Sequence, residues 1–293
     1  MNDLMRDAES LLGKAVSDGV DRRDFLKTAL GTGFAAATLP VVAQNVIKTD
    51  TAGLTAGTIT VNVAGQNVPV YRAQPEGKTN LPVVLVISEI FGVHEHIADV
   101  ARRFAKQGYL ALAPDLFIRQ GDATKVASIA DLQRDIISKT PDTQVFADLD
   151  AVVAWARANG GNADKIAITG FCWGGRITWL YAAHNPAIKA GVAWYGRLKG
   201  EVSANFPRHP IDVAGTLKAP ILGLYGAKDS GIPLDSVADM EAALALGPSK
   251  SQIVIYPNSG HAFHADYRPS YVEADARDGW NRALAWFKQH GVV

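Results

Sequence analysis

Residues 165–175 read Lys-Ile-Ala-Ile-Thr-Gly-Phe-Cys-Trp-Gly-Gly, and this stretch decides the fold. Its first half is a short β-branched run typical of a buried strand, and its second half places Cys172 between glycines at 170 and 174. A strand that turns sharply into a helix holds the residue at the turn in a strained conformation, and the glycines remove Cβ atoms that would collide there. The stretch therefore predicts a strand–turn–helix elbow that presents Cys172 as a nucleophile.

Apolar runs of the same kind recur along the chain, and most are followed by a helix-length amphipathic segment. This alternation predicts an α/β fold with a mostly parallel sheet, helices on both faces and an antiparallel hairpin at the start. The hairpin is expected at 58–63 and 67–72, the other strands at 82–87, 110–113, 166–169, 190–194, 220–225 and 252–256, and the helices at 96–107, 142–159, 174–183, 236–246 and 270–289.

Composition limits the classes of protein that fit. The chain has 293 residues, 48% hydrophobic and 20% charged, which suits one large domain. Because the net charge is zero and no basic cluster carries interleaved aromatics, we expect no nucleic-acid partner. The single cysteine excludes an internal disulfide and a multi-cysteine metal site.

Neither a metal nor another cofactor is expected. His94 and His96 are two residues apart, so on a helix they would point in different directions, and His261 with His264 has no third cluster to complete a site. The Gly174-Gly175 pair lacks the lysine of a phosphate-binding loop.

The first 43 residues are expected to be an export signal, followed by a linker at 44–56 and the catalytic domain at 57–293. Residues 21–27, Asp-Arg-Arg-Asp-Phe-Leu-Lys, resemble a twin-arginine motif in which only the first position departs. The apolar run at 29–43 is shorter than the ~20 residues that span a bilayer, so we expect cleavage near Ala43 and no stable membrane span. The twin-arginine export machinery would then be a partner and the location periplasmic or exported. The alternative is an amphipathic N-terminal helix in a cytoplasmic enzyme.

Two further residues follow strands in the way that Cys172 does. The strand at 220–225 runs into Asp229, and the strand at 252–256 runs into His261, which brings both to the sheet edge where open α/β folds place their sites. A thiol nucleophile needs a base, and the base needs a third group to fix its tautomer. Alone, the three could be a packing thiol, a turn aspartate and a loop histidine; their joint order predicts a Cys172–His261–Asp229 triad.

A wider set of motifs resembles the dienelactone hydrolase family of the α/β-hydrolase superfamily. These motifs are Glu89-Ile90-Phe91-Gly92, the segment 114–119 ending in Arg119, the elbow at 170–175, and the downstream Asp229 and His261. The similarity spans residues from about 55 to 290. It implies a hydrolase of carboxylic esters or lactones that works through a thioester acyl-enzyme. In this scheme Glu89 helps to generate the thiolate and Arg119 meets a substrate carboxylate.

The residues around this centre can also be named. The backbone N–H groups of Ile90 and Trp173 are the expected oxyanion donors, because the residue after the nucleophile and one from the first strand–helix loop converge there. Arg268, Tyr195 and Phe91 complete the expected substrate-binding set. For Glu89, a carboxylate that would be costly to bury unpaired, the alternative is an ion pair with Arg119 that only tethers two loops.

The resemblance to the family supports the type of reaction better than it supports the particular substrate. Ala262 and Ala265 stand where family members with dienelactone activity have a serine and an arginine, and Arg268 is the nearest replacement cation. We therefore expect a small ester or lactone with an anionic group. Two alternatives stay open: a broad-specificity esterase or thiol peptidase of the same fold, and a non-catalytic binding protein on a hydrolase scaffold.

Overall fold

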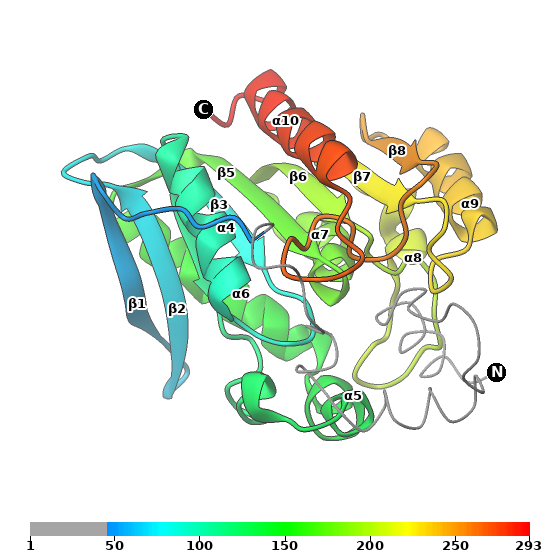
Figure 1. Ribbon diagram of the computed structural model, residues 1–293, viewed down its shortest axis with the longest axis horizontal. Coiled ribbons are helices and arrows are strands. Elements are labelled where there is room, and N and C mark those ends of the chain that lie inside the picture. Colours follow the sequence, from blue (N-terminus) through cyan, green and yellow to red (C-terminus); the bar gives the residue numbers. More distant parts are fainter. Residues whose placement is uncertain (1–45) are drawn as a thin grey trace.

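Residues 46–293, the part of the chain that the computed structural model describes, are built around an eight-stranded sheet (Figure 1). The strand order is β1-β2-β4-β3-β5-β6-β7-β8; β1 with β2 and β2 with β4 are antiparallel, and the other neighbours are parallel. The strands are β1 (Leu54–Val63), β2 (Gln66–Pro75), β3 (Leu81–Ile87), β4 (Leu110–Pro114), β5 (Gly161–Phe171), β6 (Ile188–Trp194), β7 (Ile221–Gly226) and β8 (Gln252–Tyr256).

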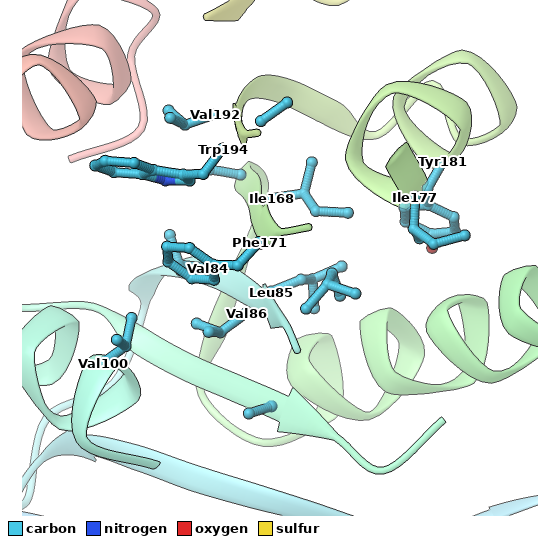
Figure 2. Packing of buried hydrophobic residues seen from close by; sticks show 14 of the residues in the cluster. Val84, Leu85, Val86, Val100, Ile168, Phe171, Ile177, Tyr181, Val192 and Trp194 are labelled. Atoms are coloured by element: carbon cyan, nitrogen blue, oxygen red, sulfur yellow. The ribbon is translucent and has the colours of Figure 1, made fainter. Parts of the chain in front are cut away.

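Helices cover both faces of this sheet. The long ones are α4 (Glu95–Lys106), α6 (Asp142–Ala158), α7 (Trp173–His184), α9 (Leu234–Ala245) and α10 (Glu273–Gln289), and the short ones include α5 (Ile129–Asp131) and α8 (Pro210–Ala214). Figure 2 shows α4 and α10 on one side of the central strands and α6 and α7 on the other. Phe104 of α4 lies 4.5 Å from Trp280 of α10, ring centre to ring centre, so these two helices also pack on each other.

The central strands are apolar along their whole length because both of their sides are covered. Val84, Leu85 and Val86 of β3 are fully buried, with their side chains directed alternately to the two helix layers (Figure 2). Burying a side chain of this size contributes about 1.5–3 kcal/mol. The core therefore fixes the register of β3 and β5, the two strands that lead into Glu89 and Cys172.

Parallel strands bring the ends of five elements to one edge of the sheet. The residues that follow β3, β5, β6, β7 and β8 include Glu89, Cys172, Tyr195, Asp229 and His261, respectively. Since the carboxyl ends of neighbouring parallel strands share an edge, side chains that are far apart in the sequence meet there.

The predicted α/β architecture, the parallel sheet and the initial hairpin are confirmed. The main difference is at β5, which has 11 residues and begins at Gly161 rather than at 166. Between β4 and α6, where no element was expected, the chain forms short helical turns. The predicted export signal lies outside the described residues. Within 46–293, no helix has the length and apolar character needed to cross a membrane.

Candidate active site

Cys172 occupies a strained turn between β5 and α7. Its φ of 55° and ψ of −116° are unusual for a residue with a side chain, and such strain, of about 1–3 kcal/mol, persists only where the surroundings impose it. Here main-chain contact imposes it: a Cβ on Gly174 would lie 2.4 Å from the carbonyl oxygen of Ile87, and one on Gly175 would lie 2.5 Å from that of Trp194. The elbow is thus wedged against β3 and β6, and the half-buried thiol is held at the sheet edge.

His261 and Asp229 form a buried pair. Nδ1 of His261 lies 2.7 Å from Oδ2 of Asp229, while Oδ1 of Asp229 accepts hydrogen bonds from the backbone N–H groups of Gly231 and Ile232. Asp229 is 5% exposed and His261 is 7% exposed. Asp229 is therefore fixed by its own loop, and it in turn fixes the orientation of the imidazole.

Cys172 lies close to the imidazole of His261. Within residues 46–293, Nε2 of His261 has no hydrogen-bond partner, although Cys172 is close enough to act on it electrostatically. Burial alone would lower the pKa of His261, but the charges of Asp229 and Cys172 outweigh burial and raise the pKa to about 10. Together these interactions favour the protonated form of the His261 ring.

Glu89 is buried with two partners from one distant loop. It is 1% exposed; the Tyr267 hydroxyl donates to Oε2, and Nη1 of Arg268 lies 3.9 Å from Oε1. Burial works to raise the pKa of Glu89, but the charge of Arg268 and the Tyr267 hydrogen bond hold this pKa below its ordinary value. The alternative of a Glu89–Arg119 ion pair is wrong, because Arg268 pairs with Glu89.

Arg119 is engaged elsewhere. Its two terminal nitrogens donate to both oxygens of Asp148 on α6, at 2.6 and 2.7 Å. Asp148 is fully buried and the Arg119 side chain is 22% exposed. A bidentate pair of this kind is among the stronger interactions of a guanidinium, so a substrate carboxylate at Arg119 would have to share the group with Asp148.

Three further residues expected to bind substrate are buried around the centre. Arg268 is 2% exposed, and its Nε and Nη1 have no hydrogen-bond partner in the part of the chain that is described. The hydroxyl of Tyr195 is likewise without a partner among residues 46–293, and the Tyr195 ring lies 5.1 Å from that of His261. Phe91 is fully buried. Buried hydrogen-bond donors are rarely left without an acceptor, and a bound ligand can supply the acceptor.

The two expected oxyanion donors are near each other. Trp173 is the first residue of α7 and Ile90 follows β3 by three residues, and the close contact of Gly174 with Ile87 brings the two segments together. Neither N–H donates a hydrogen bond within residues 46–293. A helix N-terminus also carries a partial positive charge, so this position favours a developing oxyanion.

The histidines near Glu89 lie in an aromatic cluster. His96 is 5.8 Å from His264 and 5.0 Å from Tyr267, ring centre to ring centre. Nδ1 of His96 pairs with Asp266 at 3.0 Å. Among the described residues, no group of three or more histidine, cysteine or acidic side chains is arranged to hold a metal ion.

Some residues of this site were not expected from the sequence. Tyr267 is a direct partner of Glu89, and its position before Arg268 was the only available signal. The pairing of Asp148 with Arg119 could not be predicted, because in the sequence Asp148 is one of the polar positions expected on an amphipathic helix. Asp266 was also missed.

The fold and the site together define an α/β-hydrolase: a strained elbow follows one strand, and an aspartate and a histidine follow two later strands. Comparison with known proteins agrees with this class. Residues 68–291 match the model of the "Dienelactone hydrolase family", so the chain belongs to the dienelactone hydrolase family and is an enzyme of the hydrolase class.

Relatives cover nearly the whole chain. A protein of Methylorubrum extorquens is 53% identical over 280 residues, which are 95% of this chain and 96% of the relative. A protein of Escherichia coli (strain K12) is 52% identical over 267 residues, which are 91% of this chain and 98% of the relative. Both carry the name "Putative carboxymethylenebutenolidase". The crystal structure of a "Putative Dienelactone Hydrolase" from Klebsiella pneumoniae, 56% identical, superposes with a TM-score of 0.79 over 80% of this chain and 99% of that chain.

Proposed function

We propose that this chain hydrolyses a carboxylic ester or lactone, with Cys172 as the nucleophile and a thioester acyl-enzyme as the intermediate. The proposal depends on one observation: a half-buried thiol on a strained elbow stands beside an imidazole whose other nitrogen is bonded to Asp229. This observation supports a nucleophile, a base and an orienting acid, which are the groups that acyl transfer needs.

The proton movements follow from this geometry. The raised pKa of His261 favours a state in which the thiol proton already resides on Nε2 of His261. The sulfur of Cys172 then attacks the carbonyl carbon as a thiolate, and the carbonyl oxygen becomes an anion near the N–H groups of Ile90 and Trp173. Collapse of the tetrahedral species breaks the C–O bond, and His261 returns its proton to the departing alkoxide. Water, deprotonated by His261, then attacks the thioester, releasing the acid and regenerating the thiol of Cys172.

In this scheme Glu89 acts on the thiol rather than on the substrate. Its carboxylate stays charged because Arg268 and Tyr267 stabilise it, and in this form it can accept a proton from the thiol. Removing the charge from Glu89 should therefore change thiol reactivity before it changes substrate binding.

For the substrate we propose a small ester or lactone that carries an anionic group. The relatives named carboxymethylenebutenolidase support a lactone. The Nε and Nη1 atoms of Arg268, which have no hydrogen-bond partner among the described residues, support an anion. Steady-state kinetics on a cis-dienelactone beside p-nitrophenyl acetate would test this. A preference for the neutral aryl ester would favour a broad-specificity esterase, and cleavage of peptides only would favour a thiol peptidase.

The experiment for the reaction itself is the Cys172→Ala variant. Ester turnover should fall by about 10³-fold or more, as for the loss of other catalytic nucleophiles. Mass spectrometry of the wild-type chain incubated with an activated ester should show one added acyl group, which Cys172→Ala lacks. Undiminished turnover in Cys172→Ala would remove Cys172 from the reaction, and a wild-type chain with neither turnover nor acyl adduct would be a binding protein.

We also propose that the chain is exported by the twin-arginine route, on the strength of residues 21–27 and the small residues near Ala43. Sequencing the N-terminus of the protein from fractionated cells tests this. A mature chain that begins near residue 44 outside the cytoplasm is expected; a full-length chain confined to the cytoplasm would contradict it.

A further inference from the structure

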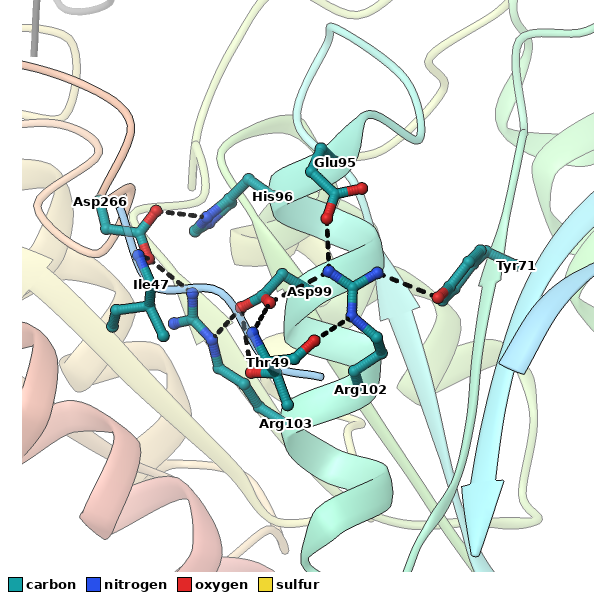
Figure 3. A network of polar contacts seen from close by, with 9 residues as sticks. All are labelled: Ile47, Thr49, Tyr71, Glu95, His96, Asp99, Arg102, Arg103 and Asp266. Atoms are coloured by element: carbon teal, nitrogen blue, oxygen red, sulfur yellow. Dashed lines mark hydrogen bonds and ion pairs between the residues drawn. The ribbon is translucent and has the colours of Figure 1, made fainter. Parts of the chain in front are cut away.

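Asp266 is the centre of a buried polar network that contains none of the triad residues. It is fully buried, and its two oxygens contact different elements: Oδ1 lies 3.0 Å from Nδ1 of His96, while Oδ2 accepts from Nη2 of Arg103 at 2.5 Å and from the backbone N–H of Ile47 at 3.4 Å (Figure 3). His96 and Arg103 both belong to α4. Asp266 therefore ties its own loop to one face of this helix.

The loop that carries Asp266 also carries the polar groups of the active site. His261 stands at its start, and Tyr267 and Arg268, the partners of Glu89, follow Asp266 directly. A displacement of Asp266 would therefore move the imidazole and the groups around Glu89 together.

The backbone of this loop is strained beside the imidazole. Ala262, the residue after His261, has a φ of 59°, a conformation that residues with a side chain rarely adopt. Backbone hydrogen bonds hold parts of the loop to each other, from Ala265 N–H to the Ala262 carbonyl and from Val272 N–H to the Phe263 carbonyl, both at 3.0 Å, but they do not tie the loop to α4. Strain of this kind persists only where the surrounding contacts fix the chain, and the ion pair of Asp266 with α4 supplies such a contact.

The network extends to the start of the described chain. Asp99 of α4, 1% exposed, accepts from Nε of Arg103 at 2.5 Å and from the backbone N–H of Thr49 at 2.6 Å. Nε of Arg102 donates to the carbonyl oxygen of Thr49 at 2.8 Å. Figure 3 shows Ile47 beside Asp266 and Thr49 beside Asp99, Arg102 and Arg103, so the segment runs from Asp266 across one face of α4. The segment and the loop are thus held by the same side of one helix.

We infer that Asp266 is a positioning residue for the reaction proposed above: through Arg103 and His96 it fixes the loop in which His261 meets Cys172 and in which Tyr267 and Arg268 meet Glu89. The inference rests on the proposed function. It assigns to α4, which supplies no reacting group, the task of holding the base and the environment of the thiol.

The charge state of this anchor supports the same assignment. Burial would raise the pKa of Asp266, but the hydrogen bond and charge of His96, followed by the charge of Arg103, lower it to about 2. His264 also faces Asp266 from within the loop. The anchor therefore stays ionised at the pH values at which His261 changes its charge.

The test is Asp266→Asn, which keeps the shape of the side chain and removes its charge. A control is Asp142→Asn, because both oxygens of Asp142 accept from Arg176, at 2.7 and 2.8 Å, and the pair is equally buried between α6 and α7. For each variant we would measure Tm, kcat and KM on p-nitrophenyl acetate, and the rate at which iodoacetamide alkylates Cys172 as a function of pH.

We expect kcat of Asp266→Asn to fall by about 10- to 100-fold with a smaller change in KM, because small misplacements of catalytic groups have effects of this size. In the plot of alkylation rate against pH, the fall in rate on the acid side (the acid limb) should begin about 1 pH unit higher, because Arg268 and Tyr267 would stabilise the Glu89 carboxylate less. His94 and His96 also face Glu89, so the profile of His96→Gln should be recorded beside it. Asp142→Asn should lower Tm and leave kcat and the limb unchanged.

A folded Asp266→Asn with wild-type kcat and an unmoved acid limb would overturn the inference, as would Asp142→Asn giving the same changes. If Asp266→Asn does not fold, Arg103→Gln removes the same ion pair from the side of α4, and the same outcomes apply. A failure of the proposed function is recognised separately, because Cys172→Ala would then retain ester turnover while the alkylation profiles still report on the loop.

Discussion

Stability should fall as pH rises through the titration of His261. The folded chain holds the pKa of His261 at about 10 against 6.5 for an unperturbed imidazole, through the charges of Asp229 and Cys172 that outweigh burial. A raised pKa means that the folded state binds the proton more tightly than the unfolded state does. The resulting stabilisation is fully present below the unfolded pKa and is lost as pH rises towards the folded one.

The magnitude follows from the two pKa values. Linkage gives about 4 kcal/mol from His261 at pH 6.5 and about 1 kcal/mol at pH 9.5, so about 3 kcal/mol should be lost over this range. This loss is a large part of the 5–15 kcal/mol, roughly, that stabilises a typical domain. It should therefore be visible in equilibrium unfolding.

Urea unfolding followed by tryptophan fluorescence, at several pH values, measures the effect. His261→Gln should lack most of the pH-dependent loss, and Cys172→Ala should show part of it because one of the two charges is absent. His290→Gln is the control, since burial lowers rather than raises the pKa of His290, and it should keep the full loss. Equal losses in wild type and His261→Gln would refute the electrostatic account of the site.

Three further changes test separate parts of the structure. Glu89→Gln should slow alkylation of the thiol by iodoacetamide near neutral pH by roughly 10-fold, whereas Glu95→Gln, on an exposed carboxylate of α4, should not; equal rates would leave Glu89 a structural role. Gly174→Ala should lower the free energy of unfolding by about 1–3 kcal/mol or more, because the new Cβ would lie 2.4 Å from a carbonyl oxygen. Gly215→Ala, which has open space around it, should lower this free energy little. Similar losses for the two variants in chemical unfolding would contradict the close contact at Gly174. Arg119→Lys should raise KM for a carboxylate-bearing lactone about 10-fold and spare p-nitrophenyl acetate; an equal effect on both substrates would show that Arg119 only holds its aspartate partner.

The fold could be predicted from the sequence because its signals are local. Continuous apolar runs mark strands buried on both faces, and the glycines at 170 and 174 mark the close approach of main chain at the elbow. The acid and the histidine could be assigned as candidates because each follows its own strand. No contact between distant residues had to be known for these steps.

The environment of Glu89 could not be predicted in the same way. Tyr267 is 178 residues away from it in sequence, and only the path of the loop after β8 brings the two together. Arg119 shows the same limit, because its partner Asp148 is 29 residues further along and reads as a surface position of a helix. A motif can name a charged residue, but which opposite charge it meets depends on tertiary packing.

The thiol and the imidazole are held in place by unlike means. Main chain against main chain wedges Cys172 between β3 and β6, so its position can change only if the sheet itself opens. The imidazole depends on a loop fastened by side chains, and such contacts loosen at lower free energy than a buried sheet does. Gentle heating should therefore abolish hydrolase activity at a temperature at which the spectrum that reports secondary structure is still that of the folded protein. Cooling should then restore activity, because the sheet has not unfolded.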